Sequence, residues 1–153
     1  MKQLLIVYHS QTGHTEAMAK AIYAGTQHAD IIDVNTHIRT AFDTELDDLL
    51  QADGIIFGTP ENFGYMSGAL KDFFDRTYYP AQGKVESLPF TVFISAENDG
   101  SGAAREIERI AKGYAFKLVQ TPIIAVGDLT PAVLSQCEEL GMSMAVGLEM
   151  GIF

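Results

Sequence analysis

Residues 4–15 read Leu-Leu-Ile-Val-Tyr-His-Ser-Gln-Thr-Gly-His-Thr, and the rest of the chain is organised around them. The apolar first half predicts a buried strand, and the second half predicts a hydroxyl-rich loop that opens a helix. Ser10, Thr12 and Thr15 offer hydroxyl donors, Gly13 lets the backbone turn tightly, and the first helical amides point back into the loop. The loop therefore suits a phosphate. The alternative is an ordinary strand-to-helix turn with a serine or threonine cap.

This loop contains no lysine or arginine. A nucleoside triphosphate site normally has a glycine-rich loop with a lysine and a magnesium-binding hydroxyl, so the pattern favours a phosphate ester held by neutral donors. His14 either lends a charge to the phosphate or faces solvent on the first helical turn. His9 lies at the strand end, where a packed or backbone-bonded histidine is expected, and His28 and His37 have no ligand spacing, so no metal site is predicted.

Apolar, β-branched segments alternate with helical stretches along the whole chain. The expected strands are Leu4–Tyr8, Ile31–Val34, Gly54–Gly58, Phe90–Ser95 and Pro122–Val126. These runs are too continuous for strands that face water on one side, so they indicate parallel strands covered on both faces. We therefore expect an α/β fold in one domain, residues 1–153, as a three-layer α/β/α sandwich with a five-stranded parallel sheet.

Apolar residues three and four positions apart predict five helices. Their inward stripes are Met18, Ala21, Ile22 and Gly25; Leu46, Leu49 and Leu50; Met66, Ala69, Leu70, Phe73, Phe74 and Thr77; Ala103, Ile107, Ile110, Ala111 and Tyr114; and Val133, Cys137, Leu140, Met144 and Leu148. Small residues in the first stripe should let that helix approach the sheet closely. Thr44 with Asp47 predicts the cap of the second helix, the third ends near Pro80, and Thr130 caps the fifth.

The composition indicates a globular protein: 47% of the residues are apolar and 20% are charged. One cysteine excludes an internal disulfide, the apolar runs are too short to span a membrane, and no secretory signal is seen, so we expect a cytoplasmic protein. The net charge is −10, with eight acids and two bases in residues 41–80. This charge disfavours nucleic acid and anionic membranes, and it either suits a basic protein partner or simply keeps the chain soluble.

Two later loops are rich in turn formers and small polar residues. Residues 58–68 read Gly-Thr-Pro-Glu-Asn-Phe-Gly-Tyr-Met-Ser-Gly, and residues 95–102 read Ser-Ala-Glu-Asn-Asp-Gly-Ser-Gly. In an open parallel sheet, ligands bind beyond the carboxyl ends of the strands. The three loops should therefore meet at one edge, where backbone amides and the rings of Phe63 and Tyr65 suit a flat ring.

With these loops, the chain resembles the flavodoxin-like family, whose members bind the FMN phosphate in a Ser/Thr-x-Thr-Gly-x-Thr loop, here residues 10–15. Residues 58–68 are most similar to the Gly-Thr-Pro-x-x-Phe-Gly-x-Met-Ser-Gly pattern of WrbA-like NAD(P)H:quinone oxidoreductases. The resemblance implies strand order 2-1-3-4-5 and one FMN per subunit. The chain departs from those enzymes in its 95–102 loop, its shorter length and its lack of the insertion associated with their tetramers.

The resemblance also implies which residues bind FMN. The phosphate group would contact Ser10, Gln11, Thr12, Gly13, His14 and Thr15; the isoalloxazine ring would contact Pro60, Glu61, Asn62, Phe63 and Gly64, with Thr59 beside them; and the ribityl chain and far side of the ring would contact Ser95, Glu97, Asn98, Asp99 and Gly100. No catalytic side chain is expected, because the flavin supplies the chemistry. Gly64 should let the peptide before it lie near the flavin N5 edge.

Two functions compete. In the first, FMN accepts a hydride from NADH or NADPH and passes electrons to a quinone or similar small acceptor. In the second, the protein is a flavodoxin-type one-electron carrier between redox protein partners, which the acidic surface would suit. A third alternative, a module that binds nothing, conflicts with the intact hydroxyl loop. Residues 150–153 are apolar and either cover a contact in a homo-oligomer or close the last helix over the core.

Overall fold

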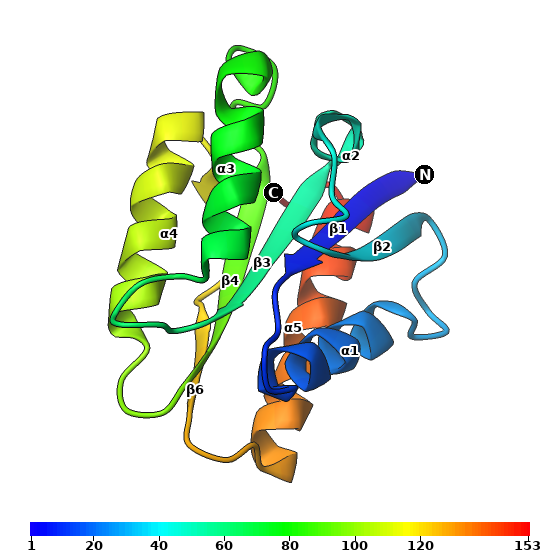
Figure 1. Ribbon diagram of the computed structural model, residues 1–153. Helices are drawn as coiled ribbons and strands as arrows, with labels where there is room; N and C mark the ends of the chain where they lie inside the picture. The colour runs from blue at the N-terminus through cyan, green and yellow to red at the C-terminus, as the bar shows by residue number, and fades with distance from the viewer.

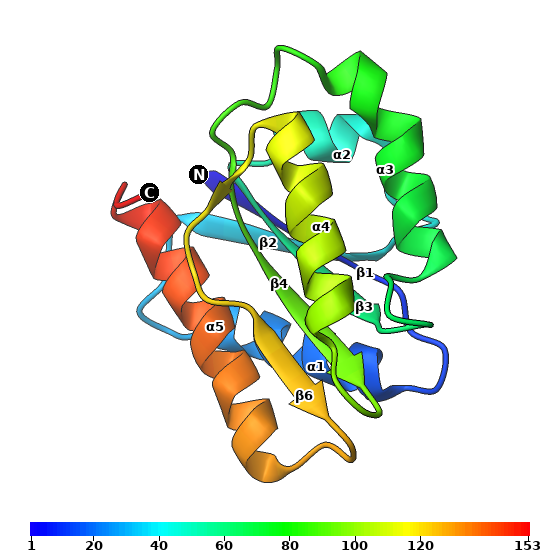
Figure 2. The same cartoon turned by 90° about the vertical axis from the view of Figure 1, so that its left-hand side faces the viewer.

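The strands of this chain form one sheet in which all paired neighbours run parallel. The computed structural model describes every residue from Met1 to Phe153. In chain order the elements are β1 (Lys2–Tyr8), α1 (His14–Thr26), β2 (Val34–Thr40), α2 (Leu46–Gln51), β3 (Gly54–Pro60), α3 (Gly68–Ala81), β4 (Pro89–Ala96), α4 (Ser101–Tyr114), β5 (Lys117–Leu118), β6 (Ile123–Val126) and α5 (Pro131–Glu149). Helices α1 and α5 cover one face of the sheet, and α2, α3 and α4 cover the other (Figure 1, Figure 2). The expected three-layer sandwich is confirmed.

The strands lie in the order β2-β1-β3-β4, and β5 and β6 share the next position beside β4. This confirms the expected order 2-1-3-4-5, with the fifth strand divided into two segments. At the break, the Thr91 hydroxyl donates to the Gln120 carbonyl oxygen (2.9 Å), and Pro122 has no N–H to continue a ladder. The sequence pattern does not reveal β5, because both of its residues are exposed.

The prediction for the second strand is wrong. The sequence favours the apolar run Ile31–Val34, whereas β2 spans Val34–Thr40. The N–H groups of Ile32 and Asp33 donate instead to one carboxylate oxygen of Glu149 (2.8 and 2.7 Å). β2 is an edge strand in which only Val34 and Ile38 are apolar, so its pattern is weaker than that of a strand buried on both faces.

Two buried apolar clusters lie on opposite faces of the sheet. In the larger, under α3 and α4, Phe57 packs against Phe73, Phe74, Phe90 and Phe116 with ring centroids 5.0 to 6.3 Å apart. Phe57 lies in the middle of β3 and Phe90 near the start of β4, so aromatic packing fixes this part of the sheet against α3 and the chain after α4.

The smaller cluster, under α1 and α5, includes the chain's one cysteine, Cys137. Burial raises the pKa of the Cys137 thiol to about 11, so the side chain is protonated and packs as a small apolar group. This agrees with its place in the predicted inward stripe of the fifth helix.

The predicted cap of the second helix is wrong by one residue. The N-cap of α2 is Glu45, whose side chain accepts from the N–H of Asp48, while the Asp48 carboxylate accepts from the N–H of Glu45 (2.8 Å). The Thr44 hydroxyl instead donates to the Thr40 carbonyl oxygen (2.7 Å). The reciprocal pair is a capping box, and it satisfies two backbone donors at once.

The third helix begins later than its apolar stripe. Met66 is buried but precedes α3, whose N-cap is Ser67; the Ser67 hydroxyl accepts from the N–H of Leu70 (3.2 Å). Pro80 lies within the last turn of α3, which ends at Ala81, close to the predicted end.

Gly25 of α1 faces α5 and not the sheet, which corrects the expectation for this residue. A Cβ added at Gly25 would clash with the carbonyl oxygen of Glu138, and one at Gly141 would clash with that of Ile22. Two glycines therefore let the backbones of α1 and α5 touch. The predicted start of α5 is confirmed, because the Thr130 hydroxyl accepts from its first turn.

The last residues of the chain fold back on α5. The ring of Phe153 lies against Gly147, while Met150 and Ile152 are exposed. The chain end therefore covers the last helix through Phe153, and a contact between copies stays a prediction. None of the helices has the length and apolar character needed to cross a bilayer.

Candidate functional site

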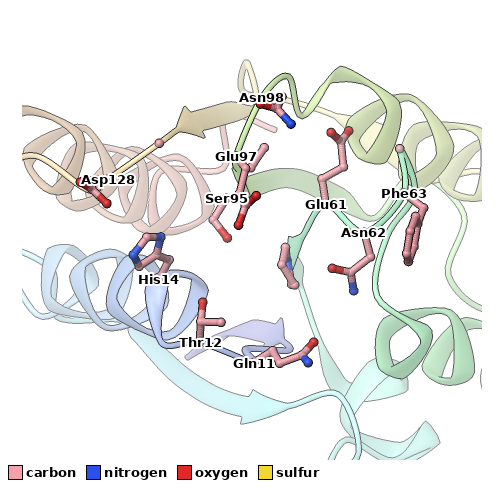
Figure 3. A pocket seen from close by; sticks show the side chains of 14 residues that line it. Gln11, Thr12, His14, Glu61, Asn62, Phe63, Ser95, Glu97, Asn98 and Asp128 are labelled. Carbon is pink, nitrogen blue, oxygen red and sulfur yellow. The ribbon is translucent and has the colours of Figure 1, made fainter.

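A cavity of about 770 Å³ opens at the carboxyl edge of the sheet, where the loops after β1, β3, β4 and β6 meet (Figure 3). It is lined by Gln11, Thr12, His14, Pro60, Glu61, Asn62, Phe63, Gly64, Ser95, Ala96, Glu97, Asn98, Gly127 and Asp128. The three loops that the sequence singles out therefore converge on one cavity, and a fourth loop joins them.

The loop after β1 delivers an uncapped helix start to this cavity. Gly13 has φ 106°, in the left-handed region, and no side chain caps α1. Ser10 closes the loop by accepting from the N–H of Gly13 (3.2 Å). Gln11, Thr12 and His14 line the cavity at this end (Figure 3). The backbone N–H groups of the first turn of α1 are thus left for an anion.

Thr15, expected at the phosphate, is instead buried behind the loop. Its side chain is 1% exposed, and its hydroxyl is hydrogen-bonded to the hydroxyl of Ser95 (2.8 Å). This bond ties the start of α1 to the end of β4. Thr15 and Ser95 therefore brace two walls of the cavity against each other.

A tight turn forms the opposite wall. Asn62 and Tyr65 pair through two backbone hydrogen bonds (2.8 and 3.0 Å), with Phe63 and Gly64 between them at φ 52° and 73°. Two positive φ values are typical of a type I′ turn. Phe63 is fully exposed, and its left-handed backbone is rare for a bulky residue. The turn therefore exposes the aromatic ring of Phe63 to solvent at the rim of the cavity.

Thr59 supports this turn from below and does not line the cavity. Its side chain is fully buried, and its hydroxyl accepts from the N–H of Ser67 (2.8 Å) and donates to the Pro60 carbonyl oxygen (2.8 Å). The hydroxyl is thus fully used in holding the start of α3 to the end of β3.

The loop after β4 contributes Ser95, Glu97 and Asn98 to the cavity. Asp99 and Gly100 lie outside the lining: the Asp99 carboxylate accepts from the Ser101 hydroxyl, and Gly100 is the N-cap of α4 with φ 89°. These last two residues shape the entry into α4.

The loop after β6 is the part of the cavity that the sequence reasoning missed. Gly127 and Asp128 line it, together with Ala96, whose carbonyl oxygen accepts from the N–H of Gly127 (2.8 Å). A signal was available, since Gly127-Asp128 is a turn pair directly after a predicted strand, and all carboxyl ends of a parallel sheet share one edge.

The profile of the flavodoxin family matches residues 6–141, from the first strand into the last helix. The chain belongs to the flavodoxin family. The expected family membership is thereby confirmed, and the match contains all four loops of the cavity.

Relatives of this chain carry two different names. The chain is 35% identical to an NAD(P)H dehydrogenase (quinone) of Acidithiobacillus ferrooxidans, over 67% of this chain and 60% of that protein. It is 28% identical to a flavodoxin of Aquifex aeolicus, over 67% of this chain and 54% of that protein. The structure of a flavodoxin, WrbA-like protein from Agrobacterium tumefaciens has a TM-score of 0.77 and 23% identity, covering 98% of this chain and 99% of that one. The chain thus spans only 54 to 60% of the two curated relatives.

Membership of this family implies a flavin, and the cavity residues fit FMN at both ends. The uncapped α1 start with Thr12 fits the phosphate, and the turn at Phe63 with the loop after β4 fits the ring. The cavity volume of about 770 Å³ lies in the range of small-molecule sites. When bound, FMN supplies electron transfer, and the protein residues only bind and orient it.

The charge of the cavity is one-sided. Three carboxylates, those of Glu61, Glu97 and Asp128, line it with no lysine or arginine, and His14 is the one basic side chain. This negative charge would disfavour further negative charge on a bound flavin, and it would repel anionic partners at long range. No group of three or more metal-ligating side chains lies together.

Proposed function

We propose that this chain is an FMN-binding oxidoreductase that passes electrons from NADH or NADPH through FMN to a quinone or a similar small acceptor. The phosphate would bind at Thr12 and the first turn of α1, and the ring would lie between the Phe63–Gly64 turn and the loop after β4. The exposed mouth of the cavity would leave room for the donor and the acceptor in turn.

The observation that carries the flavin part is the start of α1. It opens on the cavity with left-handed Gly13, without a side-chain cap and without a lysine or arginine nearby. Backbone N–H groups at a helix start are donors already aimed at an anion, and the helix dipole favours negative charge there. A phosphate ester would accept hydrogen bonds from these N–H groups, whereas in an ordinary turn a side-chain cap would already occupy them.

The reductase part is supported by the 35% identity to the quinone dehydrogenase and by the loop at residues 58–68. A second function, electron transfer between proteins, is favoured by the carboxylates Glu61, Glu97 and Asp128 and by the net charge of −10. An acidic rim would attract a basic protein partner and repel NADPH at long range.

The flavin site is tested by comparing FMN with riboflavin, which lacks the phosphate. Thr12→Val should weaken FMN binding about tenfold, the cost of a hydrogen bond to a charged group, and should leave riboflavin binding unchanged. The control is Thr121→Val, an exposed threonine outside the cavity. Equal affinity of the unaltered protein for FMN and riboflavin would contradict a phosphate site at α1.

The donor is tested by adding NADH or NADPH to the FMN-loaded protein without oxygen and following the visible flavin band. Rapid bleaching would establish a reductase and justify a screen of quinones. A bound flavin that stays oxidised would refute the reductase and favour the carrier, which should then accept electrons from a basic redox protein in a salt-dependent way.

A further inference from the structure

Glu61 joins two loops of the cavity that start on different strands. Its N–H donates to the Ser95 carbonyl oxygen at the end of β4 (2.9 Å). Its carboxylate accepts from the N–H of Gly100 through Oε1 (2.9 Å) and from the N–H of Ala103 through Oε2 (3.1 Å). Helix α4 has no side-chain cap of its own, so this carboxylate, 39 and 42 residues earlier in the chain, satisfies its first donors.

The contact continues at the tip of the turn. A Cβ added at Gly102 would lie 2.3 Å from the Gly64 carbonyl oxygen and 3.2 Å from Glu61 Oε2, so the turn is packed directly on the first turn of α4. The pairing of Asn62 with Tyr65 closes the base of the same turn. The turn is therefore held at its base by its own hydrogen bonds and on one side by α4.

We propose that Glu61 is a positioning residue for the flavin ring. Its carboxylate holds the Phe63–Gly64 turn against α4, and this fixes the distance of the turn from the ring. Each oxygen of the carboxylate accepts a backbone N–H group of α4, and we infer that Glu61 acts on the ring through the turn. The inference rests on the proposed function, because the turn positions a ring only if a flavin binds in this cavity.

The substitution Glu61→Gln tests this with little change of shape. A glutamine has one accepting oxygen, so its NH₂ group would face a backbone N–H of α4, which places two donors against each other. In the flavin-free protein, hydrogen exchange of the Gly100 and Ala103 amides should become about ten- to a hundredfold faster. This readout needs no flavin. It reports only on the hydrogen bonds from the Glu61 carboxylate to the N–H groups of Gly100 and Ala103, which we call the clamp.

Glu149→Gln is the matched control. Glu149 also accepts two backbone N–H groups, from Ile32 and Asp33, but it does so with one oxygen, Oε1. A glutamine keeps an accepting oxygen there, and Glu149 does not line the cavity. This variant should leave the exchange of the α4 amides and every property of a bound flavin unchanged.

The flavin readouts are the visible spectrum and the affinities for FMN and riboflavin. In Glu61→Gln, the visible band of the bound flavin should shift, and both affinities should fall by the same factor, about tenfold, because the ring end is disturbed and the phosphate end is not. A residue that only caps a helix would change neither the spectrum nor the affinities.

Each result decides between the alternatives. Unchanged exchange at Gly100 and Ala103 would refute the clamp. Faster exchange with an unchanged flavin spectrum and affinity would refute the positioning role and leave only a helix cap. If the unaltered protein binds neither flavin, the proposed function falls and the positioning role falls with it, while the exchange data still judge the clamp. If Glu61→Gln does not fold, Gly102→Ala perturbs the same contact from α4.

Discussion

Replacing Gly102 by alanine would drive a methyl group into the turn that borders the cavity. The added Cβ would lie 2.3 Å from the Gly64 carbonyl oxygen, whereas ordinary contacts of this kind begin at 3.4 Å. The turn or the helix must therefore move by about 1 Å to relieve the overlap. Gly102 lies in the first turn of α4, and its backbone is not left-handed, so the substitution adds no backbone strain.

Two effects on stability oppose each other. Alanine in place of glycine favours a helix by up to about 1 kcal/mol, and overpacking usually costs about 1–3 kcal/mol. The clash is with an exposed turn that can yield, so the cost should fall at the low end. We expect the unfolding free energy to change by no more than about 1 kcal/mol, or about 4 °C in Tm for a chain of this size.

The effect on the site should be larger than the effect on stability. A displacement of about 1 Å is enough to spoil the geometry of a binding wall, and we expect FMN affinity to fall about tenfold or more. The assay is quenching of flavin fluorescence on titration with the flavin-free protein, alongside thermal unfolding followed by circular dichroism.

Gly113→Ala is the control on the same helix. A Cβ at Gly113 would meet only the Tyr78 ring, at an ordinary 3.6 Å, so this variant should gain stability and keep its flavin affinity. If Gly102→Ala binds FMN as tightly as Gly113→Ala does, the close contact between α4 and the turn has no role in the site.

Two further predictions concern the scaffold. Gly141→Ala should destabilise the protein by about 1–2 kcal/mol in urea denaturation, although alanine has a better helix propensity than glycine. The added Cβ would meet the backbone of Ile22 in α1, which cannot move aside as a side chain would. A stabilised variant would contradict the close contact between the two helices. Glu149 has a pKa below its ordinary value, since its carboxylate accepts the N–H groups of Asp33 and Ile32. This stabilisation is present above about pH 4.5 and is lost as the pH falls through the lowered pKa. The unfolding free energies of the unaltered protein and Glu149→Gln should therefore converge in acid. A constant difference between them across that pH range would contradict the role of the Glu149 charge.

The layers and most elements follow from local patterns. Continuous apolar runs predict β1, β3 and β4, which are buried on both faces, and intervals of three and four predict α4 and α5. The same reasoning fails at β2, because Ile32 and Asp33 read as strand but donate to Glu149, more than a hundred residues away. The sequence around Ile32 gives no indication that a distant carboxylate will accept these N–H groups.

The sequence likewise predicts some features of the cavity and not others. Its loops after β1, β3 and β4 were predictable, because turn formers after buried strands must gather at one sheet edge. The individual roles were not predictable: the Thr15 hydroxyl bonds to Ser95 and the Thr59 hydroxyl to Ser67, and neither threonine lines the cavity. A hydroxyl in a loop has several donors and acceptors within reach, and its sequence position does not choose among them.

By itself, the sequence determined the alternation of strands and helices and the kinds of residue that gather at one edge, because hydrophobic period and turn chemistry act over a few residues. Only the tertiary structure decided which loops touch. Glu61 caps α4, Gly64 packs on Gly102, and Asp128 enters the cavity, since the strand order brings together segments that are far apart in the chain. Contacts of this length depend on how whole elements pack, and no short stretch of sequence contains that information.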